Sequence, residues 1–212
     1  MSSPPFGLTF VEYKILKKLT TPIKIQDYLD SLPINFEKKG ETYMSPRRVL
    51  REQKAHCFEG ALLAALCLML QGEDPLILDL KTNDDDVDHV IALYKRNGYF
   101  GAISKTNHAS VRFRDPVYKS VREIALSYFH EYFLDTTGEK TLQSYSRAIH
   151  LKQFGFTWIT TEEDLYPMAE RIDALAHKEI VPKVNAKYIR KADSMERRAG
   201  RITEWKFRDG GT

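Results

Sequence analysis

Residues 54–72 read KAHCFEGALLAALCLMLQG, and this stretch decides the fold. From Cys57 to Gln71 nearly every position is apolar or small, which predicts a helix that is buried on most of its circumference. Gly72 readily adopts the left-handed conformation that ends such a helix. The sequence therefore predicts one central helix with Cys57 at its N-terminus.

A cysteine at the start of a helix is a candidate nucleophile. The positive end of the helix dipole and its unpaired N–H groups stabilise a thiolate and lower the thiol pKa. Residues 87–95 then predict a strand, whose period of two places His89 on the same face as Ile91 and Leu93. A histidine brought next to Cys57 would complete a nucleophile and base couple.

The segments after the central helix indicate an antiparallel sheet. Residues 75–80 predict a strand, and an acidic turn leads from it to the His89 strand. Asn97-Gly98 is a strong hairpin signal, which folds residues 99–104 back beside the His89 strand. Short helices are expected before Ser45, and Ser45-Pro46 should begin another.

Further elements are expected in the second half of the chain. Asp115-Pro116 should open an aromatic-rich helix that ends near Gly138, and residues 155–159 have the pattern of a brief strand. Residues 165–175 predict a last helix. We expect one domain over residues 1–182, with its core at 45–135, and a basic, exposed or mobile tail over 183–212.

Composition restricts the cellular setting. The two cysteines, Cys57 and Cys67, lie ten positions apart in one predicted helix, about 15 Å, so they cannot pair with each other. The N-terminus lacks the pattern of a signal peptide, and the longest apolar run is far below the roughly 18 residues that span a bilayer. We expect a cytoplasmic protein with no membrane partner. The net charge of +3 does not by itself imply a polyanionic partner.

A series of motifs lies in order along this region. They are RVLRE at 48–52, HCFEGAL at 56–62, DVDHV at 86–90, GYFGAISK at 98–105 and YKSVRE at 118–123. Residues 47–104 resemble the core of the transglutaminase-like branch of the papain-like cysteine superfamily. The likeness is greatest to bacterial transglutaminase-like proteins, where it extends to Tyr132.

The resemblance implies an α+β fold of papain-like topology, with the cysteine helix packed on a small antiparallel sheet and flanking helices. It implies acyl transfer or amide hydrolysis without a cofactor, acting on a peptide, protein or small amide. Cys57 would be the nucleophile and His89 the base and acid. Where the family has an aspartate, however, this chain has Ser104. Asn107 is the first substitute for that carboxylate, and Asp88 and Asp115 are others.

Several polar residues near Cys57 are candidates for binding substrate. Gln53 is the side chain that we would test first as an oxyanion donor, although an ordinary solvated role is favoured. His56 is interpreted as a polar neighbour at the helix cap or as an alternative base. Arg51, with Arg47, Arg48 and Lys54, has helical spacing that would suit an anionic substrate, while a solvated face is the default.

Other classes of function receive less support. The alternative to an enzyme is a catalytically slow transglutaminase-like fold that binds peptides or proteins. The acidic residues 84–88 lack the glycine and distal glutamate of an EF-hand, and the histidines show no zinc spacing, so no metal site is expected. Nucleic-acid binding through Arg197, Arg198 and Arg201 is a weaker hypothesis.

Overall fold

The computed structural model describes residues 3–206 and has an α+β fold built on a seven-stranded antiparallel sheet. The strands follow the order β4-β3-β2-β1-β5-β7, and β6 pairs with β1. Their bounds are β1 (Leu76–Thr82), β2 (His89–Arg96), β3 (Tyr99–Ile103), β4 (Arg114–Tyr118), β5 (Leu142–Ser146), β6 (Ile149–His150) and β7 (His177–Glu179).

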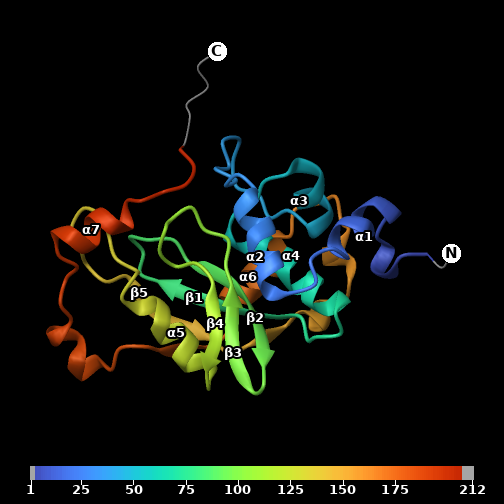
Figure 1. Cartoon of the computed structure of the whole chain (residues 1–212). Helices are drawn as coiled ribbons and strands as arrows, with labels where there is room; N and C mark the ends of the chain where they lie inside the picture. Colours follow the sequence, from blue (N-terminus) through green and yellow to red (C-terminus); the bar gives the residue numbers. More distant parts are fainter. Residues whose placement is uncertain (1–2, 207–212) are drawn as a thin grey trace, which may run out of the picture.

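Helices cover both faces of this sheet, and Figure 1 shows the N-terminal helices gathered around α4. The α-helices are α1 (Phe10–Leu16), α2 (Pro22–Ser31), α3 (Pro46–Glu52), α4 (Cys57–Leu70), α5 (Val121–Phe129), α6 (Tyr166–Asp173) and α7 (Ser194–Gly200). Short 3₁₀ helices are η1 (Pro5–Gly7), η2 (Leu151–Phe154), η3 (Thr157–Ile159) and η4 (Lys183–Tyr188).

Two hydrophobic layers share the central strands. Ile77 and Ala92 pack in the layer that contains α4, whereas Leu78, Ile91 and Leu93 pack in the layer that contains α5. This division follows from the pleat, because successive side chains of a strand point to opposite faces. The His89 strand is therefore held between two cores, which fixes its position relative to α4.

The central helix is confirmed. α4 runs from Cys57 to Leu70, and every residue from Phe58 to Met69 is buried. Gly72 has φ +84°, and the N–H of Glu73 donates to the Leu68 carbonyl, which ends the helix as predicted. The two end residues, Cys57 and Leu70, are partly exposed, so the helix presents the thiol at its open N-terminal end.

Gly60 gives one prediction about stability. A Cβ at this position would lie 2.4 Å from Cβ of the fully buried Lys105, so the helix and the segment after β3 approach too closely for a side chain. We expect Gly60→Ala to lower the free energy of unfolding by about 1–3 kcal/mol, as overpacking does. Urea denaturation followed by circular dichroism measures this change. An unchanged unfolding midpoint would show that the two segments separate easily.

The hairpin at Asn97-Gly98 is also confirmed. Both residues have positive φ, 52° and 85°, and Arg96 pairs with Tyr99 across the turn. Asp115-Pro116 was expected to open a helix, but it lies in edge strand β4, and α5 begins only at Val121 behind the Ser120 cap. Proline is tolerated on an edge strand as well as in the first turn of a helix, so Asp115-Pro116 is compatible with either element.

Two other expectations were wrong. Residues 155–159, expected as a brief strand, contain the 3₁₀ helix η3, whose Trp158 and Ile159 are buried. The sheet is larger than the small one expected, because β5 and β6 pair with β1 and β7 pairs with β5. These strands are short, from two to five residues, and short strands carry little periodic signal.

The C-terminal segment, residues 183–206 of the predicted tail, has mostly exposed side chains but makes many backbone contacts. It contains η4 and α7, and the N–H of Ala192 donates to the Gly138 carbonyl. Gly200 packs against Phe133, where an added Cβ would lie 2.9 Å from the ring. The exposure was expected from its composition, whereas these contacts with distant loops were not. Residues 207–212 of that tail lie outside the described part of the chain.

The helices also bear on membrane association. Within residues 3–206, no helix combines the length and the apolar character needed to cross a bilayer.

Candidate active site

Cys57 is the first residue of α4, and its thiol is half-buried at the open end of the helix. The chain enters the helix along a fixed path, because Ala55 pairs with the segment 33–35. The N–H of Asn35 donates to the Ala55 carbonyl, and the N–H of Ala55 donates to the Pro33 carbonyl. Sγ lies 3.9 Å from the carbonyl oxygen of Asp88, directly before the His89 strand. The thiol lines one cleft together with the imidazoles of His56 and His89.

His89 is buried and its ring is oriented by Ser104. His89 Nε2 and Ser104 Oγ lie 2.7 Å apart, and the Ser104 hydroxyl donates to the Val111 carbonyl at 2.8 Å. Since that hydroxyl has then used its only proton, the N–H at His89 Nε2 is the donor to Ser104. With Nε2 bonded to Ser104, Nδ1 is the ring nitrogen that remains free to exchange a proton.

Ser104 is itself held from two sides. Its backbone N–H donates to Oε1 of Gln26 at 3.0 Å, and its carbonyl accepts from Nε2 of Gln26 at 2.8 Å. The His89 ring also packs near Tyr128 and Tyr132, with centroids 6.4 and 6.2 Å away. Helix α2, strand β3 and helix α5 together restrict the ring to one orientation.

The two imidazoles change the charge of the thiol. Burial alone would raise the pKa of Cys57, but hydrogen bonds and charge from His56 and His89 more than offset this and hold that pKa at about 5. Burial likewise lowers the pKa of His56, while Cys57 and the carboxylate of Glu59 raise it to about 9. Between these pH values Cys57 is a thiolate beside the imidazolium of His56.

Glu59 organises the start of α4. This fully buried carboxylate lies 3.4 Å from His56 Nε2, which also donates to the Thr42 carbonyl at 2.7 Å. Its two oxygens accept hydrogen bonds from the Asn35 amide, the Thr42 hydroxyl and the backbone N–H groups of Met44 and His56. The His56 ring is thereby surrounded by acceptors, which favours its charged form.

This network gives a second prediction. In Glu59→Gln an amide N–H₂ replaces one of the two acceptor oxygens and faces donors, so we expect a loss of about 2–4 kcal/mol in the free energy of unfolding. Chemical denaturation measures it, with Glu37→Gln at the more exposed rim as the matched control. Equal unfolding midpoints for the two variants would contradict the organising role of Glu59.

Two clefts meet at Cys57. The first has a volume of about 400 Å³ and is lined by Cys57, His89, Lys105 and Tyr132, among others. The second, of about 360 Å³, has Tyr43 and Tyr166 and several carboxylates in its walls. Both clefts include His56 and Cys57 in their linings, so each of them reaches the thiol.

Lys105 was not singled out by the sequence. Its Nζ donates to the carbonyls of Leu29, at 2.9 Å, and Leu32 at the end of α2, so it caps that helix from inside the core. Burial lowers the pKa of this ammonium to about 8. No spacing rule predicts a lysine that is fully buried directly after a strand, because long charged side chains are normally exposed.

Two predicted substrate-binding residues lie away from both clefts. Gln53, expected as the first oxyanion donor to test, ends α3 with φ 52° and donates to the Tyr28 hydroxyl and the Leu50 carbonyl. Arg51 is exposed and pairs with Glu162 at 2.7 Å. Both side chains lie on the outer surface of α3, and the chain turns inward only at Ala55. Gln53 therefore does not reach the thiol, although it is only four positions from Cys57.

The other basic residues of this region are also paired with carboxylates. Arg47 contacts Glu12 at 2.7 Å, and Arg48 contacts Asp164 at 2.8 Å. The expected solvated face does not hold for these two side chains, which are 23% and 13% exposed, and their ion pairs give them a structural role rather than an anionic substrate site. Among the described residues, no group of three or more His, Cys, Asp or Glu side chains could hold a metal ion.

The substitutes for the missing carboxylate lie elsewhere. Asn107 lines the first cleft, but its amide binds the backbone of Trp205 at 2.8 and 2.9 Å. The Asp88 carboxylate accepts hydrogen bonds from the N–H and hydroxyl of Thr82, and Asp115 is exposed on β4. Of the predicted orienting residues, the structure places Ser104 against the His89 ring.

The geometry around Cys57 and His89 is the basis for assigning a function, because comparison with known proteins identifies no relative. No family model matches the chain, and no curated protein is similar enough to be counted as a relative.

Proposed function

We propose that this protein carries out thiol-dependent acyl transfer or amide hydrolysis, on a core of the papain-like, transglutaminase-like kind. The observation that carries the proposal is the meeting of three side chains at one cleft. Cys57 and His89 line the same cleft, and His89 Nε2 lies 2.7 Å from the buried Ser104 hydroxyl. A nucleophile, a base and a residue that orients the base form the general arrangement for covalent catalysis.

The reaction follows from these positions. The Cys57 thiolate attacks the amide carbonyl, and the N–H groups at the start of α4 face the oxyanion that forms. The imidazolium of His89 transfers its proton to the departing amine, so the C–N bond breaks, His89 becomes neutral and a thioester remains on Cys57. Water or a second amine, deprotonated by His89, then attacks the thioester and releases acid or a new amide.

Ser104 determines how well His89 performs these transfers. Its oxygen fixes the tautomer that leaves Nδ1 free, but a hydroxyl carries no charge to stabilise the imidazolium. An aspartate at this position would also face the Val111 carbonyl, which now accepts the Ser104 proton at 2.8 Å. The absence of a charged group at Ser104 is the reason for the second hypothesis, a catalytically slow member of this class that binds peptides.

An acylation experiment separates these possibilities. The full chain is mixed with p-nitrophenyl acetate, and intact and peptide mass spectrometry follow acetylation of Cys57 and its release in buffer or with added primary amine. The proposal requires an adduct on Cys57 that is released, to water for hydrolysis or to the amine for transfer. Absence of the adduct, or an adduct that persists as long as on a free cysteine peptide, contradicts it.

A further inference from the structure

The final described residues pair with a loop beside the candidate site. The N–H of Ala109 donates to the Ile202 carbonyl at 2.8 Å, the N–H of Glu204 donates to the Asn107 carbonyl at 2.9 Å, and His108 pairs with Thr203 in an antiparallel bridge. Residues 202–205 therefore form an added strand along residues 107–109. Main-chain pairing of this kind is how many proteins bind extended peptides.

The Asn107 side chain completes this pairing. Its Oδ1 accepts the N–H of Trp205 at 2.8 Å, and its Nδ2 donates to the Trp205 carbonyl at 2.9 Å. Both contacts are to backbone atoms, so any residue with a free N–H satisfies them equally. The amide is thus a two-point clamp for a peptide bond rather than for a particular side chain.

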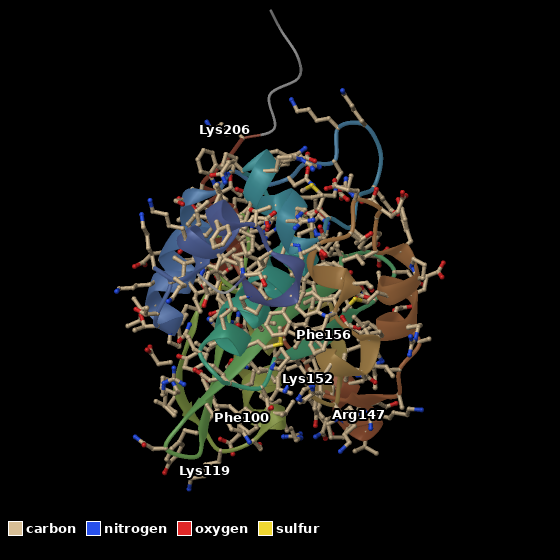
Figure 2. The ribbon with its side chains drawn as sticks, turned by 90° about the vertical axis from the view of Figure 1, so that its right-hand side faces the viewer. Phe100, Lys119, Arg147, Lys152, Phe156 and Lys206 are labelled. Atoms are coloured by element: carbon tan, nitrogen blue, oxygen red, sulfur yellow. The ribbon has the colours of Figure 1, made fainter. Side chains whose placement is uncertain are left out.

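Side chains of residues 202–205 also contact an arginine and a nearby hollow. Glu204 pairs with Arg112 at 2.8 Å. Trp205 lines a hollow of about 670 Å³ together with Ile34 and Phe36. The segment leads from α7 towards the N-terminal loop at the top of Figure 1, and Figure 2 shows Lys206 at the opposite end of the molecule from Phe100 and Lys119.

This place is continuous with the candidate active site. Asn107, His108 and Gly200 line the same cleft as Cys57 and His89. The segment fits imperfectly, because Trp205 Nε1 is buried without a hydrogen-bond partner among the described residues. An unsatisfied buried donor weakens binding, so an occupant with a wholly apolar aromatic ring would fit better.

We propose that residues 107–109, with Arg112 and the Ile34–Phe36 hollow, form a substrate subsite for an extended polypeptide, and that the chain's own residues 202–205 occupy it as an internal competitor. The preferred segment carries an acidic residue followed by an aromatic residue, opposite Arg112 and the hollow. This inference rests on the proposed function for the meaning of "substrate", but the binding site stands on its own contacts.

The test compares full-length chains with altered segments. Trp205→Pro removes the N–H that Asn107 accepts, whereas Trp205→Ala keeps it and removes only the indole. A fluorescent peptide of residues 200–206 is titrated into each chain and followed by anisotropy. Because an attached segment competes at high effective concentration, we expect the Trp205→Pro chain to bind the peptide at least about tenfold more tightly than the unaltered chain. Trp205→Ala should give a smaller increase.

A second substitution tests the clamp. Adding Asn107→Ala to the Trp205→Pro chain should weaken peptide binding by about tenfold, and a peptide with proline in place of Trp205 should bind as weakly. Equal affinity of the unaltered and Trp205→Pro chains, or binding that ignores Asn107, overturns the inference. The pH profile of Cys57 alkylation in the Trp205→Pro chain reports separately on the proposed chemistry, so the two can fail independently.

Discussion

Replacing Cys57 with alanine is expected to abolish acyl-enzyme formation and to lower amide turnover by about 10⁴-fold or more. Removal of a catalytic nucleophile has effects of this size because the remaining groups cannot form the covalent intermediate. Turnover is followed with a fluorescent peptide library as the amide source, and the adduct by mass spectrometry. The substituted side chain is small and half-buried, so the fold should persist.

Cys67 provides the matched control. It is buried in the middle of α4, and burial raises its pKa to about 12, so it remains a neutral thiol at physiological pH. Cys67→Ala should therefore leave the acylation of the protein unchanged. Turnover that survives Cys57→Ala would place the chemistry elsewhere and contradict the proposed function.

His56→Gln is expected to cause the second large effect, on the charge of the thiol. Hydrogen bonding and charge from both imidazoles hold the pKa of Cys57 at about 5, against desolvation that raises it. Losing the His56 imidazolium moves this pKa upward, towards the ordinary cysteine value. At pH 6 we expect the rate of iodoacetamide alkylation to fall by about tenfold or more, because only the thiolate reacts.

The matched control for this variant is His150→Gln. His150 is near the surface, with Nε2 3.2 Å from Asp74, and lies on β6 away from the two clefts. Its replacement should leave the alkylation rate unchanged. Equal rates for His56→Gln and the unaltered chain would assign the thiolate to His89 and the helix N-terminus alone.

The sequence was sufficient where local pattern and tertiary structure agree. The apolar run from Phe58 to Met69 has one stable outcome, a buried helix, and Gly72 ends it. The period of two in the His89 strand predicted that His89 shares a face with Ile91 and Leu93, and all three are buried. Asn97-Gly98 predicted the hairpin that follows this strand. These signals are strong because each depends on interactions between residues that are close together in the sequence.

The remaining parts of the site depend on contacts between distant segments. His56 and Glu59 are three positions apart, a spacing that signals a helix cap, but the acceptors that charge His56 include Thr42 from another loop. Asn107 was a reasonable choice for the orienting residue by residue type, yet its amide is used by Trp205, nearly a hundred positions later. Neither partner is visible from local spacing.

For Gln53 the structure agrees with the favoured interpretation, an ordinary polar side chain, rather than with an oxyanion donor. Gln53 is only four positions from Cys57, but it has a left-handed backbone that ends α3 and sends the chain in a new direction. The side chain therefore points to Tyr28 rather than towards the thiol. A positive φ at a residue other than glycine is rarely predictable from its sequence.

The proposed chemistry requires Cys57 to be a thiolate beside imidazoles in an accessible cleft. This is tested by the rate of iodoacetamide alkylation of the unaltered chain from pH 4 to pH 10, with peptide mass spectrometry assigning the product to Cys57. We expect a midpoint near pH 5, where the pKa of Cys57 lies, and a plateau through neutral pH. A single rise with a midpoint at about pH 8.5, the ordinary cysteine value, would contradict it.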